Sequence, residues 1–151
     1  MTAKAAVGGL CSCLCDHRIG LGVIDPGVID LGDDDIAIAA ISVVELTVGA
    51  LLASGQRRMR RQSYVDDICA TIPILTYDRA VALEHADLLV SVRRTGRARR
   101  AHDLIIAATA VASRRVVVTA DRTAFTDLSR VTSISDIART SEPHIGTPGA
   151  T

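Results

Sequence analysis

The sequence has few aromatic residues: its 151 residues include one Phe, two Tyr and no Trp. It therefore offers few rings on which nucleic-acid bases could stack. Nearly half of the residues are apolar, mostly Ala, Val, Ile and Leu, a composition typical of helices packed on a sheet of β-branched residues. A chain of this length is expected to form one domain with a substantial buried core.

Long apolar runs and a disulfide framework are also missing. No apolar run reaches the roughly 18 residues that a membrane span needs, and the segment before Cys11 has no small-x-small cleavage site of a signal peptide. Three of the four cysteines fall within residues 11–15, unlike the spread cysteines of a secreted disulfide domain. Their Cys-x-Cys-x-Cys spacing lacks the gaps of zinc sites. We therefore expect a cytoplasmic protein without a membrane segment.

The chain also lacks net charge, because its 17 basic and 17 acidic side chains balance. Arg supplies all but one of the basic side chains, and nine of the 16 Arg fall in two clusters. The cluster at 57–61, "RRMRR", has the pattern of a solvated helix face. The cluster at 93–100, "RRTGRARR", holds five Arg directly before Asp103 and suits phosphate contacts, with a solvated helix end as the alternative. The candidate RNA-binding residues are Arg97, Arg99 and Arg100.

Short apolar runs alternate with helical patterns along the chain. Residues 36–41, "IAIAAI", predict a buried strand, and Ser42-x-x-Glu45 has the form of a capping box that opens a helix. This alternation predicts an α/β fold with a parallel sheet covered on both faces. Further strands are expected at 72–78, 116–121 and 131–135, and further helices from 79 to Gly96 and from His102 or Asp103 onward.

Three acidic residues lie near the ends of predicted elements. Glu45 lies one turn into the helix that follows the strand at 36–41, Asp103 opens a helix, and Asp121 ends the strand at 116–121. In parallel sheets, functional sites lie at the carboxyl ends of the strands. Converging carboxylates repel one another and raise each other's pKa unless a cation neutralises them. Mg²⁺ or Mn²⁺ is the suitable ion, and it can activate water and bind a phosphate, which is nuclease chemistry.

Each acid also has a purely structural explanation. Glu45 could be the capping partner of Ser42, Asp103 a first-turn helix acid, and Asp121 a turn residue after a strand. The hypothesis of a site rests on the three together. A phosphate-binding glycine motif is absent from the sequence, which argues against a nucleotide-binding Rossmann domain.

Two segments carry a resemblance to a known family. "AISVVELTVGAL" resembles the strand-then-helix segment of PIN domains, and "RARRAHDLIIAATAVASRRVVVTADRTAF" is similar to the second half of VapC toxins. The resemblance covers about residues 32–137. It implies a PIN-like three-layer α/β/α domain over residues 1–140 with a central, mainly parallel sheet and a divergent segment at 1–31. The Pro- and Gly-rich residues at 141–151 predict a mobile tail.

The resemblance also implies a function. VapC toxins are Mg²⁺-dependent endoribonucleases of type II toxin–antitoxin pairs that cut structured RNA, dimerise, and are blocked by a VapB-type antitoxin. By this resemblance Glu45, Asp103 and Asp121 are expected to be the catalytic residues, holding Mg²⁺ (or Mn²⁺) that activates water. The alternative is a degenerate, catalytically weak or inactive PIN domain that serves as an antitoxin-binding protein.

The sequence departs from the family pattern at its first acid. Family members place an Asp at the end of the first strand, and alignment of "CSCLCDHR" on the family's stretch after that Asp puts Leu10 at the position. The neighbouring acids are Asp16, about one turn too late, and Asp25, only 20 residues before Glu45. Ala124 is a second departure, since relatives often have an acid there.

Overall fold

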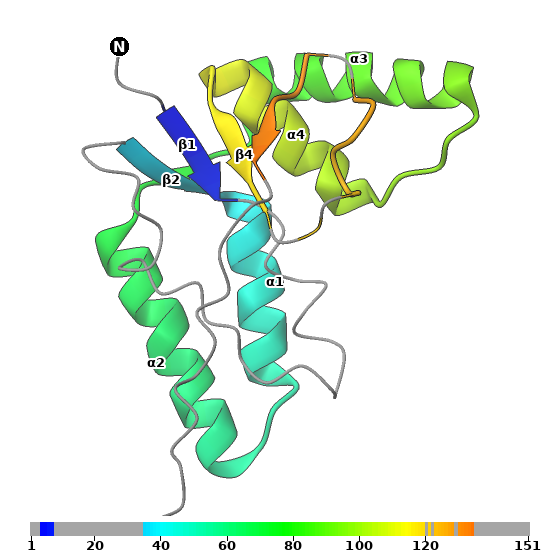
Figure 1. The fold of residues 1–151 in the computed structure, drawn as a ribbon. Coiled ribbons are helices and arrows are strands. Elements are labelled where there is room, and N and C mark those ends of the chain that lie inside the picture. Colours follow the sequence, from blue (N-terminus) through cyan, green and yellow to red (C-terminus); the bar gives the residue numbers. More distant parts are fainter. Residues whose placement is uncertain (1–3, 8–34, 120, 122, 129, 135–151) are drawn as a thin grey trace, which may run out of the picture.

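Strands and pairs of helices follow one another along the described part of the chain. The computed structural model describes residues 4–7, 35–119, 121, 123–128 and 130–134 (Figure 1). Leu10, Asp16, Asp25, the cysteines of 11–15 and the tail at 141–151 lie outside these residues. The elements are β1 (Lys4–Val7), β2 (Asp35–Ala39), α1 (Ala40–Leu51), α2 (Gly55–Thr71), β3 (Ile74–Leu75), α3 (Arg79–Thr95), α4 (Ala101–Ser113), β4 (Val116–Val118) and β5 (Ser133–Ile134).

The strands form one sheet in the order β3-β2-β1-β4-β5. Every pairing is parallel, so the carboxyl ends of the strands meet at one edge. The central strand is β1, in which Val7 is in register with Ile38 of β2 and Val118 of β4. The predicted parallel α/β sheet is confirmed, and this edge receives the residues that follow β2 and β4.

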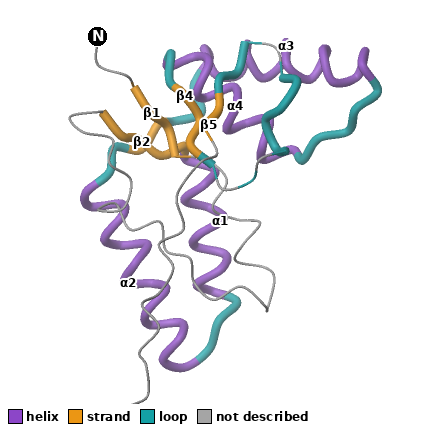
Figure 2. Tube along the Cα trace, in the orientation of Figure 1, coloured by secondary structure: helices purple, strands orange, loops and turns teal. Residues whose placement is uncertain are grey.

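Helices cover both faces of the sheet. Successive residues of a strand point to opposite faces, and Ile38 and Ala39 of β2 accordingly belong to different core clusters. Ile38 packs with the buried side chains of α1 and α2, whereas Ala39 packs with those of α3 and α4. Figures 1 and 2 show α1 beside α2 and α3 beside α4. This arrangement is the expected three-layer α/β/α architecture.

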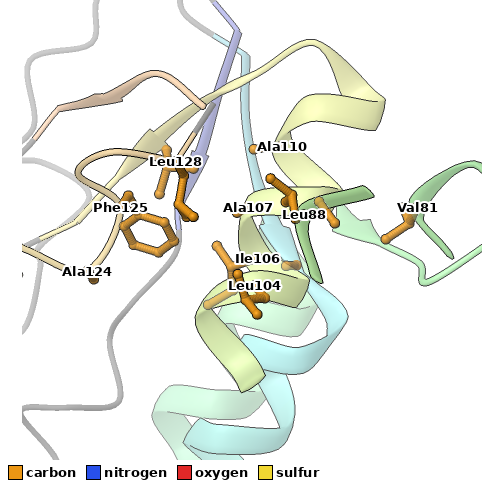
Figure 3. Packing of buried hydrophobic residues seen from close by; sticks show 12 residues of the cluster. Val81, Leu88, Leu104, Ile106, Ala107, Ala110, Ala124, Phe125 and Leu128 are labelled. Carbon is orange, nitrogen blue, oxygen red and sulfur yellow. The ribbon is translucent and has the colours of Figure 1, made fainter. Parts of the chain in front are cut away.

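The larger cluster is built around α4, which is buried over most of its length. Its apolar side chains meet Leu88 of α3 and two residues of the loop after β4, Phe125 and Leu128 (Figure 3). Phe125, the single Phe of the sequence, is 2% exposed, and burial of such a side chain contributes about 1.5–3 kcal/mol. Packing therefore fixes the start of α4 and the loop after β4 relative to each other.

The capping box predicted at Ser42 is wrong. Helix α1 begins at Ala40, directly after β2, and its N-cap is Ala39. Ser42 lies within the helix, and its buried Oγ has no hydrogen-bond partner in the described part of the chain. The strand leads into the helix without a loop, so the capping motif has no helix end to cap. Glu45 is consequently free of the structural role that Ser42 would have given it.

Other predicted boundaries differ by a few residues. Helix α3 ends as predicted at Gly96, whose φ of 65° is the left-handed conformation that favours glycine. Strand β4 ends at Val118, before the predicted end at Asp121, because Thr119 Oγ1 accepts a hydrogen bond from the Asp121 amide (3.1 Å) and turns the chain. Across the described residues, no helix combines the length and apolar character that crossing a bilayer requires.

Candidate active site at the carboxyl edge of the sheet

Three elements bring the candidate acids toward one another. Glu45 lies in the second turn of α1, after β2; Asp103 lies in the first turn of α4; and Asp121 follows β4. Burial raises the pKa of Asp103 above its ordinary value; the charge of Arg100 opposes this rise, and the charges of Glu45 and Asp121 add to it. The three acids, far apart in sequence, therefore lie within electrostatic reach of one another around Asp103.

Asp121 is held in a tight turn. Its Oδ1 accepts hydrogen bonds from the amide of Thr123 (2.9 Å), the hydroxyl of Thr123 (2.8 Å) and the amide of Ala124 (3.1 Å). The bonds from Thr123 are the main reason that the pKa of Asp121 lies below its ordinary value. Asp121 is thus ionised and oriented, and its Oδ2 takes no part in these bonds. Its proposed structural role as a turn residue coexists with its place in the site.

Glu45 is joined to α4 by a histidine. His102 Nδ1 lies 2.7 Å from Glu45 Oε1, across 57 positions of the sequence. The Glu45 side chain is 10% exposed, whereas that of His102 is 50% exposed. From its place beside Asp103, the sequence suggests a surface position in the first helical turn or a phosphate contact for His102. Nothing near it in the sequence indicates a contact with α1.

Arg99 serves the loop after Asp121 instead of facing a ligand. Its Nη1 donates to the carbonyl oxygens of Thr123 (2.7 Å) and Ala124 (3.3 Å), and its Nη2 donates to that of Thr126. Two of these three residues, Thr123 and Ala124, donate the hydrogen bonds that hold Asp121. Arg99 therefore supports the turn that positions an acid of the site.

The other two predicted RNA-binding arginines differ from each other. Arg97 pairs with Asp127 in the same loop, and both side chains are more than 60% exposed. Arg100 is the N-cap residue of α4, and its charge lowers the pKa of both Asp103 and Asp121. Of the three arginines, Arg100 is the one whose charge acts on the candidate site acids Asp103 and Asp121.

Carboxylate oxygens are the ligands that Mg²⁺ prefers. Burial is the main cause of the raised pKa of Asp103, and the charges of Glu45 and Asp121 add to it, so a nearby cation would favour its ionised form. Within the described residues, however, no three acidic, histidine or cysteine side chains are gathered closely enough to form a metal cluster. Mg²⁺ keeps several of its waters and needs only one or two protein carboxylates. The donor types present therefore suit this ion.

The fold matches solved structures, although no protein-family model and no curated protein matches the chain. The chain is similar to VapBC-5 of the VapBC toxin–antitoxin family from Mycobacterium tuberculosis, with 26% identity, coverage of 87% of this chain and 98% of that one, and a TM-score of 0.68.

Two further structures agree with this match. VapBC2 from Rickettsia felis, bound to a DNA fragment from its promoter, has 20% identity, coverage of 87% and 97%, and a TM-score of 0.70. VapBC-1 from nontypeable Haemophilus influenzae has 16% identity, coverage of 88% and 97%, and a TM-score of 0.68. At these identities the latter two establish a shared fold.

Proposed function

The chain is a VapC-like PIN domain, and we propose that it is a cytoplasmic, Mg²⁺-dependent endoribonuclease toxin of a type II toxin–antitoxin pair. One observation carries the proposal: Glu45 and Asp121 both lie close enough to the half-buried Asp103 for their charges to act on it. Three acids at the carboxyl edge of a parallel sheet are suited to a metal-dependent hydrolase.

The acids would have distinct roles. Asp103 would be the central ligand of Mg²⁺, with Glu45 and Asp121 completing its surroundings directly or through water; Mn²⁺ could take its place. When bound, the ion supplies a Lewis acid and a water of lowered pKa. Asp121 stays ionised because its turn donates hydrogen bonds to it, so one acid of the set is ready to receive a cation.

Arg100 is the residue that we assign to the RNA phosphate. It lies near two acids of the site, and a guanidinium can make paired hydrogen bonds to phosphate oxygens. Arg97 could exchange its exposed partner Asp127 for a phosphate, because an exposed ion pair contributes little. Arg99, whose guanidinium donates to three carbonyls, would act on RNA only through the loop it holds.

The proposed partners are a VapB-type antitoxin, a second copy of the chain, and structured RNA as substrate. The similar structures are VapBC complexes, which supports the antitoxin and the dimer. The rival function, a catalytically weak or inactive PIN domain that binds an antitoxin, is favoured by one observation: the described residues hold no ready cluster of three metal ligands.

Cleavage of a structured RNA by the purified protein, with Mg²⁺ or with a chelator, tests the proposal. Asp103→Asn is expected to lower the cleavage rate by about 100-fold or more, because even outer-shell partners of metal ligands contribute about 10- to 100-fold. Asp67→Asn, which changes an exposed acid of α2, is the matched control and should cleave like the wild type. A wild-type protein that cuts nothing with either Mg²⁺ or Mn²⁺, yet binds its antitoxin, would establish the rival function.

A further inference from the structure

We propose that His102 is a positioning residue for Glu45, which it holds in the orientation that a divalent cation requires. The inference rests on the proposed function, since it concerns the same site. The observation behind it is the 2.7 Å contact between His102 Nδ1 and Glu45 Oε1. The proposed cleavage chemistry assigns no other role to this histidine.

The chemistry of the contact fixes the direction of the hydrogen bond. An ionised carboxylate can only accept, so the Nδ1 atom of His102 carries the hydrogen and donates it to Glu45. Because Oε1 is engaged by the imidazole, the rotation of the carboxylate is restricted and Oε2 has a defined direction. The half-exposed ring of His102 makes this bond without being buried.

Glu45 needs such a partner because of its surroundings. Its side chain is nearly buried, at 10% exposure, and its charge repels that of Asp103. A carboxylate in this position is driven to turn away from the second acid unless a donor restrains it. His102 precedes Asp103 in the first turn of α4, so one helix end carries both the central acid and the donor that orients its neighbour.

Outer-shell hydrogen bonds of this kind fix metal ligands in other proteins and contribute about 10- to 100-fold to metal affinity or activity. His102 would act in this way across the two helices α1 and α4. Its effect should therefore appear in the affinity for the ion and not in the stability of the fold, because the bond is exposed on the histidine side.

The test compares three substitutions of His102 by their Mn²⁺ affinity, measured calorimetrically, and by the Mg²⁺ concentration needed for cleavage. In Asn the amide nitrogen lies where Nδ1 lies in His, whereas in Gln it does not. His102→Ala and His102→Gln are expected to weaken Mn²⁺ binding by about 10-fold or more, and His102→Asn is expected to stay near the wild type. All three should keep the urea midpoint of the metal-free protein.

Two reference variants separate this inference from the proposed function. If Asp103→Asn and Glu45→Gln weaken Mn²⁺ binding and His102→Ala does not, the positioning role is wrong and the metal site stands. If His102→Ala tightens Mn²⁺ binding, the histidine competes with the ion and the proposal is overturned. If neither reference variant changes Mn²⁺ binding, the metal site itself is wrong.

Discussion

Two aspartates of the candidate site are held in opposite electrostatic states. Burial and the nearby charges of Glu45 and Asp121 make ionised Asp103 unfavourable, which raises its pKa. Hydrogen bonds from Thr123 favour ionised Asp121, which lowers its pKa. Pairs of acids whose surroundings separate their pKa values are typical of sites where the two have different tasks. Here hydrogen bonds stabilise the ionised form of Asp121, whereas the ionised form of Asp103 is the one that a nearby cation would stabilise most.

These shifts predict opposite effects of pH on stability. The folded pKa of Asp103 exceeds its unfolded value, so its contribution to stability is present below about pH 3.8 and is lost as pH rises through the folded pKa. Asp103→Asn should therefore be at least as stable as the wild type at pH 7. Metal-free protein would be melted from pH 3 to pH 8, and the two melting curves should converge at the acidic end.

The reverse is expected for Asp121. Its folded pKa is lowered, so its contribution is present above about pH 3.8 and is lost as pH falls through the folded pKa. Asp121→Asn keeps the acceptor but loses the charge and should be less stable at pH 7, by on the order of 1 kcal/mol. The same melting series checks it, and a variant less stable than the wild type at pH 3 as well would contradict the electrostatic explanation.

At the residue scale, sequence reasoning found acids and missed their supports. Glu45, Asp103 and Asp121 were predictable because each lies beside a predicted strand or helix end, where a parallel sheet places functional residues. His102 and Arg99 were not predictable in their observed roles, since their partners lie 57 and about 25 positions away. A contact across that distance leaves no local pattern.

At the scale of elements, the connection from α3 to α4, residues 96–100, holds the loop after β4 through side-chain contacts. Arg99 is half-buried and donates to three carbonyls of that loop, while Arg97 reaches Asp127 from the solvent. Two neighbouring arginines thus touch the same loop with very different burial, which allows their contributions to be compared directly.

Arg99→Ala is expected to lower the free energy of unfolding by about 1–3 kcal/mol, because hydrogen bonds from a charged group contribute in this range and the carbonyls lose their donor. Arg97→Ala should cost no more than about 0.5 kcal/mol, as is usual for exposed ion pairs. Urea denaturation of both variants measures the difference. Equal losses would mean that the three hydrogen bonds of the half-buried Arg99 guanidinium contribute no more than the exposed ion pair of Arg97.

Hydrophobic patterning predicted β2 to β5 but did not predict the central strand β1, and it placed the ends of elements less well than their presence. The runs at 36–41, 72–78 and 116–121 all contain strands, but β4 stops where Thr119 begins a turn through its side chain. The start of α1 was misplaced because Ser42 and Glu45 fit a capping motif that a directly continuing chain does not use. Propensity identifies elements, whereas specific hydrogen bonds decide where they stop.

At the scale of the whole molecule, the two helical layers differ in how much they bury. Helix α4 buries six residues against the sheet and α3, but α2 buries only Val65 and Ile68 over 17 residues. Layers with few buried apolar contacts open more easily than the core. The layer formed by α1 and α2 is therefore expected to be the weaker half of the fold.

Native-state hydrogen exchange checks this expectation. Amides of α2 should exchange through openings of lower free energy than those of α4, whose protection should approach global stability. Ile68→Ala removes one of the two buried side chains of α2. It should speed amide exchange in α2 more than in α4, so the difference in protection between the two helices should increase. Equal protection of both helices would show instead that the molecule opens as a single unit.

The position of β1 has a consequence for how the chain is made. During synthesis this middle strand precedes its partner β2, whereas β4 emerges only after helices α1 to α4. A nascent chain can assemble β1, β2 and β3 before β4 is made. The edge of β1 that pairs with β4 in the complete sheet then has unpaired backbone N–H and C=O groups. Open edges attract strands of other chains, so synthesis passes through an aggregation-prone interval that ends when β4 docks.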